Sequence, residues 1–71
     1  MKVYLTHKYG PATEPKCRRI EFSNEAEAVT RACALIAAGA AGDIFEITDD
    51  AEHVITDDQA IRSRCKQTMM P

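Results

Sequence analysis

The sequence predicts an α+β domain with the element order ββαββα, in which the helices pack on one face of a small, largely antiparallel sheet. Three observations predict it: two pairs of short β-type runs, an alanine-rich segment with helical periodicity between the pairs, and a second helical pattern after them. The 71 residues leave room for one domain, residues 1–71, and we expect the tail at 69–71 to be frayed. The order of the strands in the sheet does not follow from these patterns.

The first two strands are predicted to form a hairpin. Residues 3–6 alternate apolar and polar side chains, and residues 18–22 place Ile20 and Phe22 on one face. Between them, residues 9–15 contain a glycine and two prolines, which favour a loop because proline cannot donate to a strand ladder. We therefore expect a hairpin with a long loop that is stiffened by proline.

The first helix has a clear start signal. Asn24 followed three residues later by Glu27 is a capping box, with Ser23 as the alternative cap. The predicted inward stripe at helical spacing consists of Val29, Ala32, Cys33 and Ile36. We expect Gly39 to end the helix, since glycine readily adopts the left-handed conformation that closes many helices.

Residues 43–48 and 52–56 predict a second hairpin around a loop at 49–51. This register would pair Phe45 with Ile55 on the inner face. The carboxylates expected on its outer face are Glu46 and Glu52.

The last helix is predicted to begin at Thr56, with Gln59 at the capping-box position. The carboxylates expected in its first turn, where the helix dipole favours negative charge, are Asp57 and Asp58. Its predicted buried stripe is Ile61, Cys65 and Met69.

The cysteines indicate neither a disulfide-stapled scaffold nor a metal site. Cys33 and Cys65 fall on the apolar helical stripes and are expected in the core, while Cys17 lies among polar residues. No close pair of cysteine or histidine ligands occurs, so we expect no metal and no cofactor. Strand alternation would point His7 away from Cys17, which leaves no nucleophile beside a base. We therefore expect no catalytic residues and no enzyme activity.

The charge is unevenly distributed. Residues 43–60 hold seven carboxylates and no lysine or arginine, whereas residues 1–22 and 61–71 are both net basic within a chain of net charge −2. Each carboxylate suits its turn, helix start or strand face, but the lack of any balancing cation is not accounted for by local structure. Such a surface would attract the basic groove of a nucleic-acid-binding protein. The residues predicted to bind this partner are Glu46, Asp49, Asp50, Glu52, Asp57 and Asp58.

An alternative function uses the sheet face that the helices leave open. Tyr4, Lys8 and Arg19 would share that face and could hold single-stranded nucleic acid through stacking and charge. Against this alternative, the whole chain is acidic. A third interpretation is a homodimer in which an exposed sheet edge extends into a continuous sheet.

In its length, its ββαββα order and its acidic run from Asp43 to Asp58, the chain resembles the small phage-encoded anti-CRISPR proteins. The resemblance implies a non-enzymatic inhibitor that blocks the DNA-binding surface of a CRISPR effector complex, in some members as a DNA mimic. The resemblance rests on length, element order and charge distribution and on no diagnostic motif, so no residue role is carried over. The basic segments around Arg18 and Arg62 depart from a uniformly acidic mimic.

The expected location is the cytoplasm, in a bacterial host if the protein is phage-encoded. No apolar run approaches the roughly 18 residues of a spanning helix. The N-terminal residues also lack the apolar segment of a secretory signal. We therefore expect a soluble protein with no membrane partner.

Overall fold

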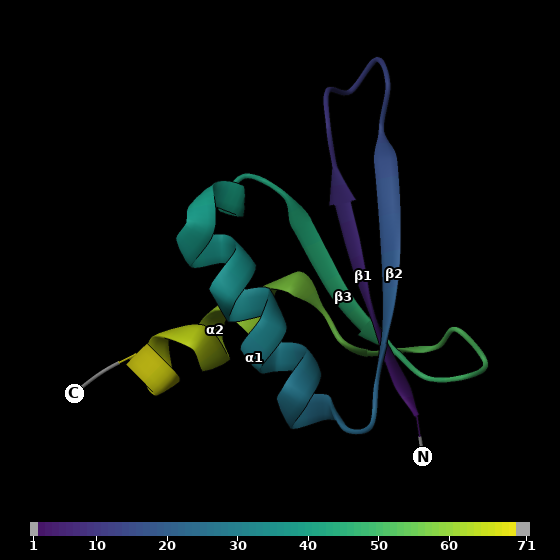
Figure 1. Cartoon of the computed structure of the whole chain (residues 1–71), viewed down its shortest axis with the longest axis vertical. Helices are drawn as coiled ribbons and strands as arrows, with labels where there is room; N and C mark the ends of the chain where they lie inside the picture. The colour runs from purple at the N-terminus through teal and green to yellow at the C-terminus, as the bar shows by residue number, and fades with distance from the viewer. Residues whose placement is uncertain (1, 70–71) are drawn as a thin grey trace.

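The computed structural model describes residues 2–69, with side chains up to Lys66. The elements in chain order are β1 (Val3–Tyr9), β2 (Lys16–Phe22), α1 (Glu25–Leu35), a π-helical turn η1 (Ile36–Ala40), β3 (Ile44–Thr48), β4 (Val54–Thr56) and α2 (Asp58–Met69). The predicted order ββαββα is therefore confirmed (Figure 1). Of the tail expected to be frayed, residues 70–71 lie outside the described residues, as does the side chain of Met69. No helix among residues 2–69 combines the length and the apolar content needed to cross a membrane.

The four strands form one antiparallel sheet with the order β2-β1-β3-β4. Strands β1 and β3 are central, so β2 and β4 are the two edges. Both helices pack on the same face, because the inward residues of β1 and β3 form one core cluster with residues of α1 and α2. This arrangement confirms the predicted α+β class with helices on one face of the sheet.

The core is a single cluster under the two helices. Its buried members are Val3, Leu5, Ala28, Val29, Ala32, Phe45, Ile47, Ile61 and Cys65. The strand members alternate along β1 and β3, as the two-residue period of a half-buried strand requires. Phe22 packs against the cluster from the end of β2 and is only partly buried.

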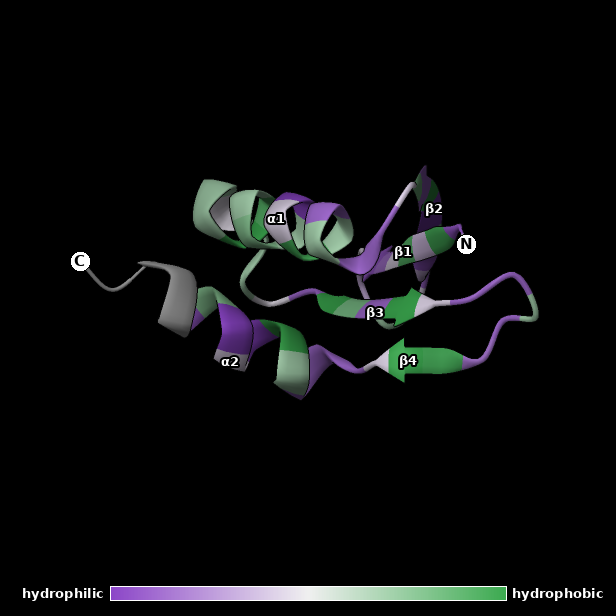
Figure 2. Ribbon diagram, turned by 90° about the horizontal axis from the view of Figure 1, so that it is seen from below, coloured by the Kyte–Doolittle hydropathy of each residue, from purple (hydrophilic) through white to green (hydrophobic). Residues whose placement is uncertain are grey.

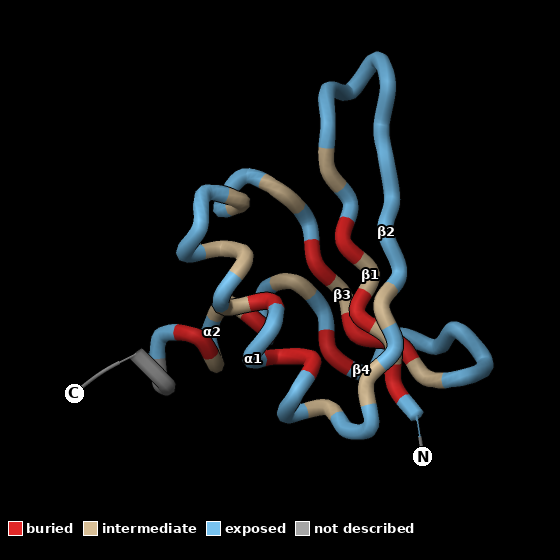
Figure 3. The backbone as a smooth tube through the Cα atoms, in the orientation of Figure 1, coloured by how far each residue is buried: buried red, intermediate tan, exposed pale blue. Residues whose placement is uncertain are grey.

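The β1–β2 hairpin is longer than predicted and projects beyond the core. Its strands continue to Tyr9 and Lys16, and its loop spans residues 10–15. Residues 10–19 are all exposed, and Figure 3 shows this distal part standing clear of the helices. Gly10, with φ +89°, supplies the left-handed conformation at the start of the loop. Residues 8–19 are called the arm below.

The predicted ends of the first helix are confirmed. Asn24 Oδ1 accepts the N–H of Glu27 at 2.9 Å, and the Asn24 amide donates to the Glu27 carboxylate at 3.0 Å. This pairing satisfies a backbone donor that a helix start would otherwise leave open. Gly39 has φ +119°, a conformation that glycine adopts at little cost, and the helical segment ends one residue later.

The predicted register of the second hairpin is wrong. Strand β4 pairs with Ile47 and Thr48 of β3 and not with Phe45: Ile47 lies opposite Thr56, and Thr48 lies opposite Val54. Ile55 is 43% exposed instead of facing the core. The loop spans five residues, 49–53, where three were expected, and the register shifts beside it, so the side chains of β4 are displaced.

The predicted cap of the last helix is also wrong. Asp57 takes that position: its Oδ1 accepts the N–H of Ala60 at 2.9 Å, and its carbonyl accepts the N–H of Ile61 at 3.0 Å. Thr56 instead ends β4, where its hydroxyl donates a hydrogen bond to the Glu25 carboxylate. Aspartate and threonine both suit an N-cap. Because Thr56 is the last residue of β4, the cap of α2 is the next residue, Asp57.

A disulfide joins the two helices, contrary to the expectation from cysteine number. Cys33 of α1 and Cys65 of α2 are bonded, with their Cα atoms 5.5 Å apart. The prediction that both belong to the core still holds, since Cys65 is buried and Cys33 packs against the cluster. Cys17 is free and exposed.

Candidate functional site

The sheet face that no helix covers gathers the residues of the alternative prediction. Register places Tyr4 opposite Glu21, and Lys8 opposite Cys17, with Arg19 between them on β2. These positions alternate with the buried residues of β1, so their side chains lie on the open face. The structure therefore brings Tyr4, Lys8 and Arg19 together on one face, as that prediction required.

Tyr4 and Arg19 form a cation–π stack on this face. The guanidinium carbon of Arg19 lies 3.9 Å from the centroid of the Tyr4 ring. Partial burial and a hydrogen bond to the Asp50 carboxylate raise the pKa of the Tyr4 hydroxyl. The Arg19 guanidinium thus lies over the Tyr4 ring, and Arg19 itself is exposed.

Most of the positive charge of the arm is not compensated by an ion pair. Lys16, Arg18 and Arg19 lie on exposed β2, and none of the three forms an ion pair with a carboxylate of the described residues. Arg18 instead stacks over Tyr9 at 5.8 Å, on the opposite face from Arg19. Lys8 differs, because its Nζ lies 3.1 Å from the Glu46 carboxylate. The arm is therefore basic on both faces.

The six predicted partner-binding carboxylates are not gathered in one place. Glu46 lies on the open face against Lys8, and Asp57 caps α2. Asp58 accepts the N–H of Phe45 at 2.9 Å and pairs with Arg62 at 2.8 Å. Burial opposes ionisation of Asp58, but these two hydrogen bonds outweigh it and lower the pKa of its carboxyl group.

Asp49 builds the β3–β4 loop from within. Its Oδ1 accepts the N–H groups of His53 and Ala51, both at 2.9 Å, and these bonds lower the pKa of its carboxyl group. Asp50 is exposed beside Tyr4. Glu52 is exposed and has φ +66°, a left-handed conformation that costs a residue with a side chain about 1 kcal/mol or more. Asp50 and Glu52 are thus the carboxylates of this block that the loop itself does not use.

Sequence reasoning missed a buried pair under the base of the arm. His7 Nε2 lies 2.8 Å from Asp43 Oδ2, and the imidazole stacks on Phe45 with ring centroids 4.5 Å apart. Arg62 donates to the Asp43 carbonyl at 2.6 Å. The signal was present, since His7 shares the inward face of β1 with valine and leucine. Its Nδ1 has no hydrogen-bond partner among the described residues.

His7 and Cys17 point to opposite faces of the sheet. His7 lies on the covered face of the sheet, and Cys17 lies on the open face of β2, as strand alternation predicted. Across the described residues, no three side chains of histidine, cysteine, aspartate or glutamate converge to hold a metal ion.

No family model, no curated protein and no solved structure matches the chain.

Proposed function

We propose that the chain is a non-enzymatic domain that binds single-stranded nucleic acid along the arm and the open face of the sheet. The observation that carries the proposal is the stack of Arg19 on Tyr4, on a face that no helix covers. Unstacked bases bind on aromatic rings and on guanidinium planes, and every base offers such a face. A stacked arginine is already held flat, so less freedom is lost when a base packs on it.

The charge of the arm supports the same proposal. Phosphates running along it would meet Lys16 and Arg18 on one face and Lys8 and Arg19 on the other. Local positive charge of this kind contributes affinity through release of counterions, even when the whole chain has a net charge of −2. Carboxylates also lie on the open face, where Glu46 pairs with Lys8 and Asp50 bonds to the Tyr4 hydroxyl, so each of these two is matched by a group of the proposed site.

The test is fluorescence anisotropy with labelled 20-nucleotide single strands of DNA and RNA, and with a duplex of the same length. We expect single strands to bind more tightly than the duplex, with affinity that falls as salt rises. Loss of one stacked base costs about 1–3 kcal/mol, so Arg19→Ala should weaken binding by about 5- to 150-fold.

The matched control is Lys66→Ala, which removes one exposed positive charge from α2. It should leave affinity within about twofold, because Lys66 belongs neither to the arm nor to the open face. Equal losses in the two variants, or no binding at low salt, would refute the proposal. A preference for duplex would replace it with a different mode of binding.

A second candidate function rests on the acidic loop. Glu52 has a left-handed backbone conformation that glycine would adopt more easily. Glu52 and Asp50 are both exposed, and the Asp50 carboxylate also bonds to the Tyr4 hydroxyl. A non-glycine residue in this strained conformation suggests that its side chain has a role. The corresponding function is the one implied by the anti-CRISPR resemblance: a protein-binding inhibitor whose carboxylates occupy the basic groove of a CRISPR effector subunit.

This candidate is tested by a pull-down from nuclease-treated bacterial lysate, comparing the native chain with a double variant, Asp50→Asn with Glu52→Gln. The variant keeps Asp49, whose carboxylate holds the loop. The native chain should retain a basic nucleic-acid-binding protein that added DNA releases, and the variant should retain little. Equal recovery by both would remove the acidic loop as the binding surface.

A further inference from the structure

Strand β2 is an edge that is ready to pair. It has seven residues, contains no proline, and runs in unbroken register with β1 from Phe22 to Lys16. An edge strand presents a row of backbone donors and acceptors, and proteins usually protect it with short length, bulges, proline or charged side chains. Strand β2 carries charged side chains but is neither short nor interrupted. The other edge, β4, is three residues long and has a register shift, but β2 has neither protection.

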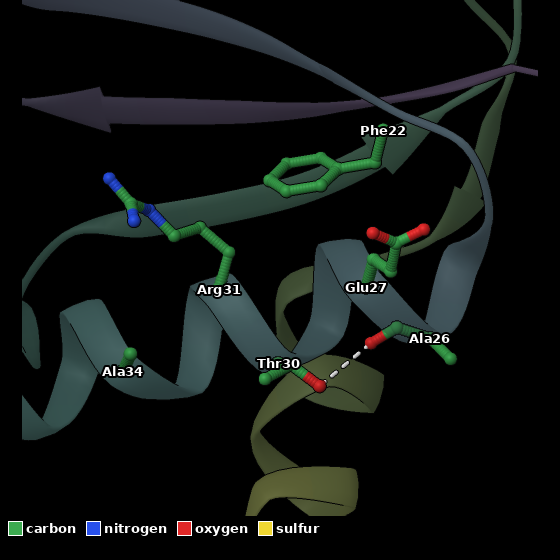
Figure 4. Close-up of a pocket in the computed structure, with 6 residues that line it drawn as sticks. All are labelled: Phe22, Ala26, Glu27, Thr30, Arg31 and Ala34. Carbon is green, nitrogen blue, oxygen red and sulfur yellow. Dashed lines mark hydrogen bonds between the residues drawn. The ribbon is translucent and has the colours of Figure 1, made fainter.

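A partly apolar groove runs beside this edge. It lies between the end of β2 and α1 and has a volume of about 430 Å³. Its lining residues are Phe22, Ala26, Glu27, Thr30, Arg31 and Ala34. Figure 4 shows the Phe22 ring lying over α1, with Glu27 and Arg31 on either side of it. A chain that paired with β2 would therefore also cover apolar surface.

We propose that a second copy of this chain pairs with β2 in antiparallel fashion, centred on Ile20, so that the two sheets become one. In this register Arg19 lies opposite Glu21 of the second copy, and the two-fold axis repeats the pair. Both side chains lie on the open face and are exposed. Within one chain Arg19 stacks on Tyr4 and Glu21 pairs with Lys2 at 3.5 Å, so pairing across the seam would rearrange or share these exposed contacts. Opposite charges directly across a strand pair stabilise it. The inference needs only the chain itself, but it uses Arg19, which also belongs to the proposed nucleic-acid site. It is therefore tested without nucleic acid.

Charge selects this register among the symmetric ones. Residues opposite each other must point to the same face, so a symmetric pairing is centred on a residue. Centring on Arg18, Arg19 or Glu21 places that charged residue against its own copy. Centring on Cys17 brings two basic positions together on the other face. Among the centres from Cys17 to Glu21, only Ile20 brings opposite charges together within the strand and places an apolar side chain on the axis.

The helix-covered face agrees with the same register. Arg18 lies opposite Phe22 of the second copy, where a guanidinium can pack on the ring. The two grooves then lie on the same side of the joined sheet, next to the seam. Glu27 and Arg31 are one helical turn apart and opposite in charge, so the groove rim is not uniformly of one sign. A second copy, whose β2 carries both positive and negative side chains, therefore suits this groove better than a partner whose surface carries charge of one sign.

Sedimentation of the protein without nucleic acid, over a concentration series, tests the proposal. The native chain should show a monomer–dimer equilibrium reaching twice the 7.9 kDa of one chain. Arg19→Glu and Glu21→Arg each put like charges together twice per dimer, and each should weaken it by about tenfold or more. Mixing the two variants should restore the dimer, because each supplies the charge that the other now needs.

The control is Lys66→Glu, which makes the same charge reversal on α2 and should leave the dimer unchanged. A native chain that stays monomeric at the highest concentration would overturn the proposal. So would a dimer that survives Arg19→Glu, or a failure of the mixed variants to associate.

Single cysteines identify the register independently. In a Cys17→Ser background, Ile20→Cys should form a cross-linked dimer under mild oxidation, since residues on the axis are within disulfide reach. Arg19→Cys and Glu21→Cys serve as matched positions one residue to either side. Fastest cross-linking at either of those two positions would contradict the Ile20-centred pairing.

Discussion

Reduction of the Cys33–Cys65 bond should cost the protein a large part of its stability. The two cysteines are 32 positions apart, so the bond closes a long loop between α1 and α2. By restricting the unfolded chain, this bond raises the free energy of the unfolded state by about 3.7 kcal/mol, which reduction would remove. The entropy of unfolding for 71 residues is roughly 150 cal/mol/K, so a loss of this size should lower the melting midpoint by about 25 °C. The total stability of a domain this size is only about 4–11 kcal/mol.

Thermal melts followed by circular dichroism, with and without a thiol reductant, measure this effect. The control is Cys17→Ser, which removes the free and exposed thiol and should show the same difference between oxidised and reduced samples. Mass spectrometry after alkylation should find one reactive thiol in the oxidised protein and three after reduction. Three reactive thiols before reduction, or equal melting midpoints, would refute the reasoning.

Three further outcomes are expected. Asp57→Ala removes the cap of α2 and should lower the free energy of unfolding by about 1 kcal/mol, measured by urea denaturation. Glu52→Gly, with φ +66° at that position, should raise it by a few tenths to 1 kcal/mol, whereas Glu52→Ala should not. The hydrogen bond from Thr56, and then Arg64, lowers the pKa of Glu25 in the folded state. Its stabilising effect is therefore complete above the ordinary glutamate pKa and is lost as pH falls through the lowered value. Urea midpoints between pH 7 and 3 should fall less in Glu25→Gln than in the native chain.

Local signals predicted most of the fold correctly. The capping box at Asn24, the glycine at the end of the first helical segment and the alternation in β1 depend on residues a few positions apart, and the structure has all three. The predicted register of the second hairpin was wrong because that register depends on the length and shape of the loop. Asp49 accepts two backbone N–H groups and closes a loop of five residues, which spacing alone did not reveal.

Contacts between distant segments were the part that the sequence did not predict. Cys33 and Cys65 were expected on buried stripes, but which helix faces meet depends on tertiary packing, and so does the disulfide. The same holds for His7 with Asp43, which are 36 positions apart. In the candidate site, Tyr4 and Arg19 could be placed on one face because a hairpin has a local register. Their stacking at 3.9 Å is a detail of side-chain conformation.

The unequal edges of the sheet limit what self-association can produce. A sheet that could grow at both edges would add copies without end and form a fibre. Here β4 has three residues and a register shift, so it offers almost no ladder, and growth is confined to β2. Figure 2 shows β4 as a short strand beside β3. If two copies pair through β2, each uses the one long sheet edge found among its described residues, so the assembly would close at two and would not polymerise.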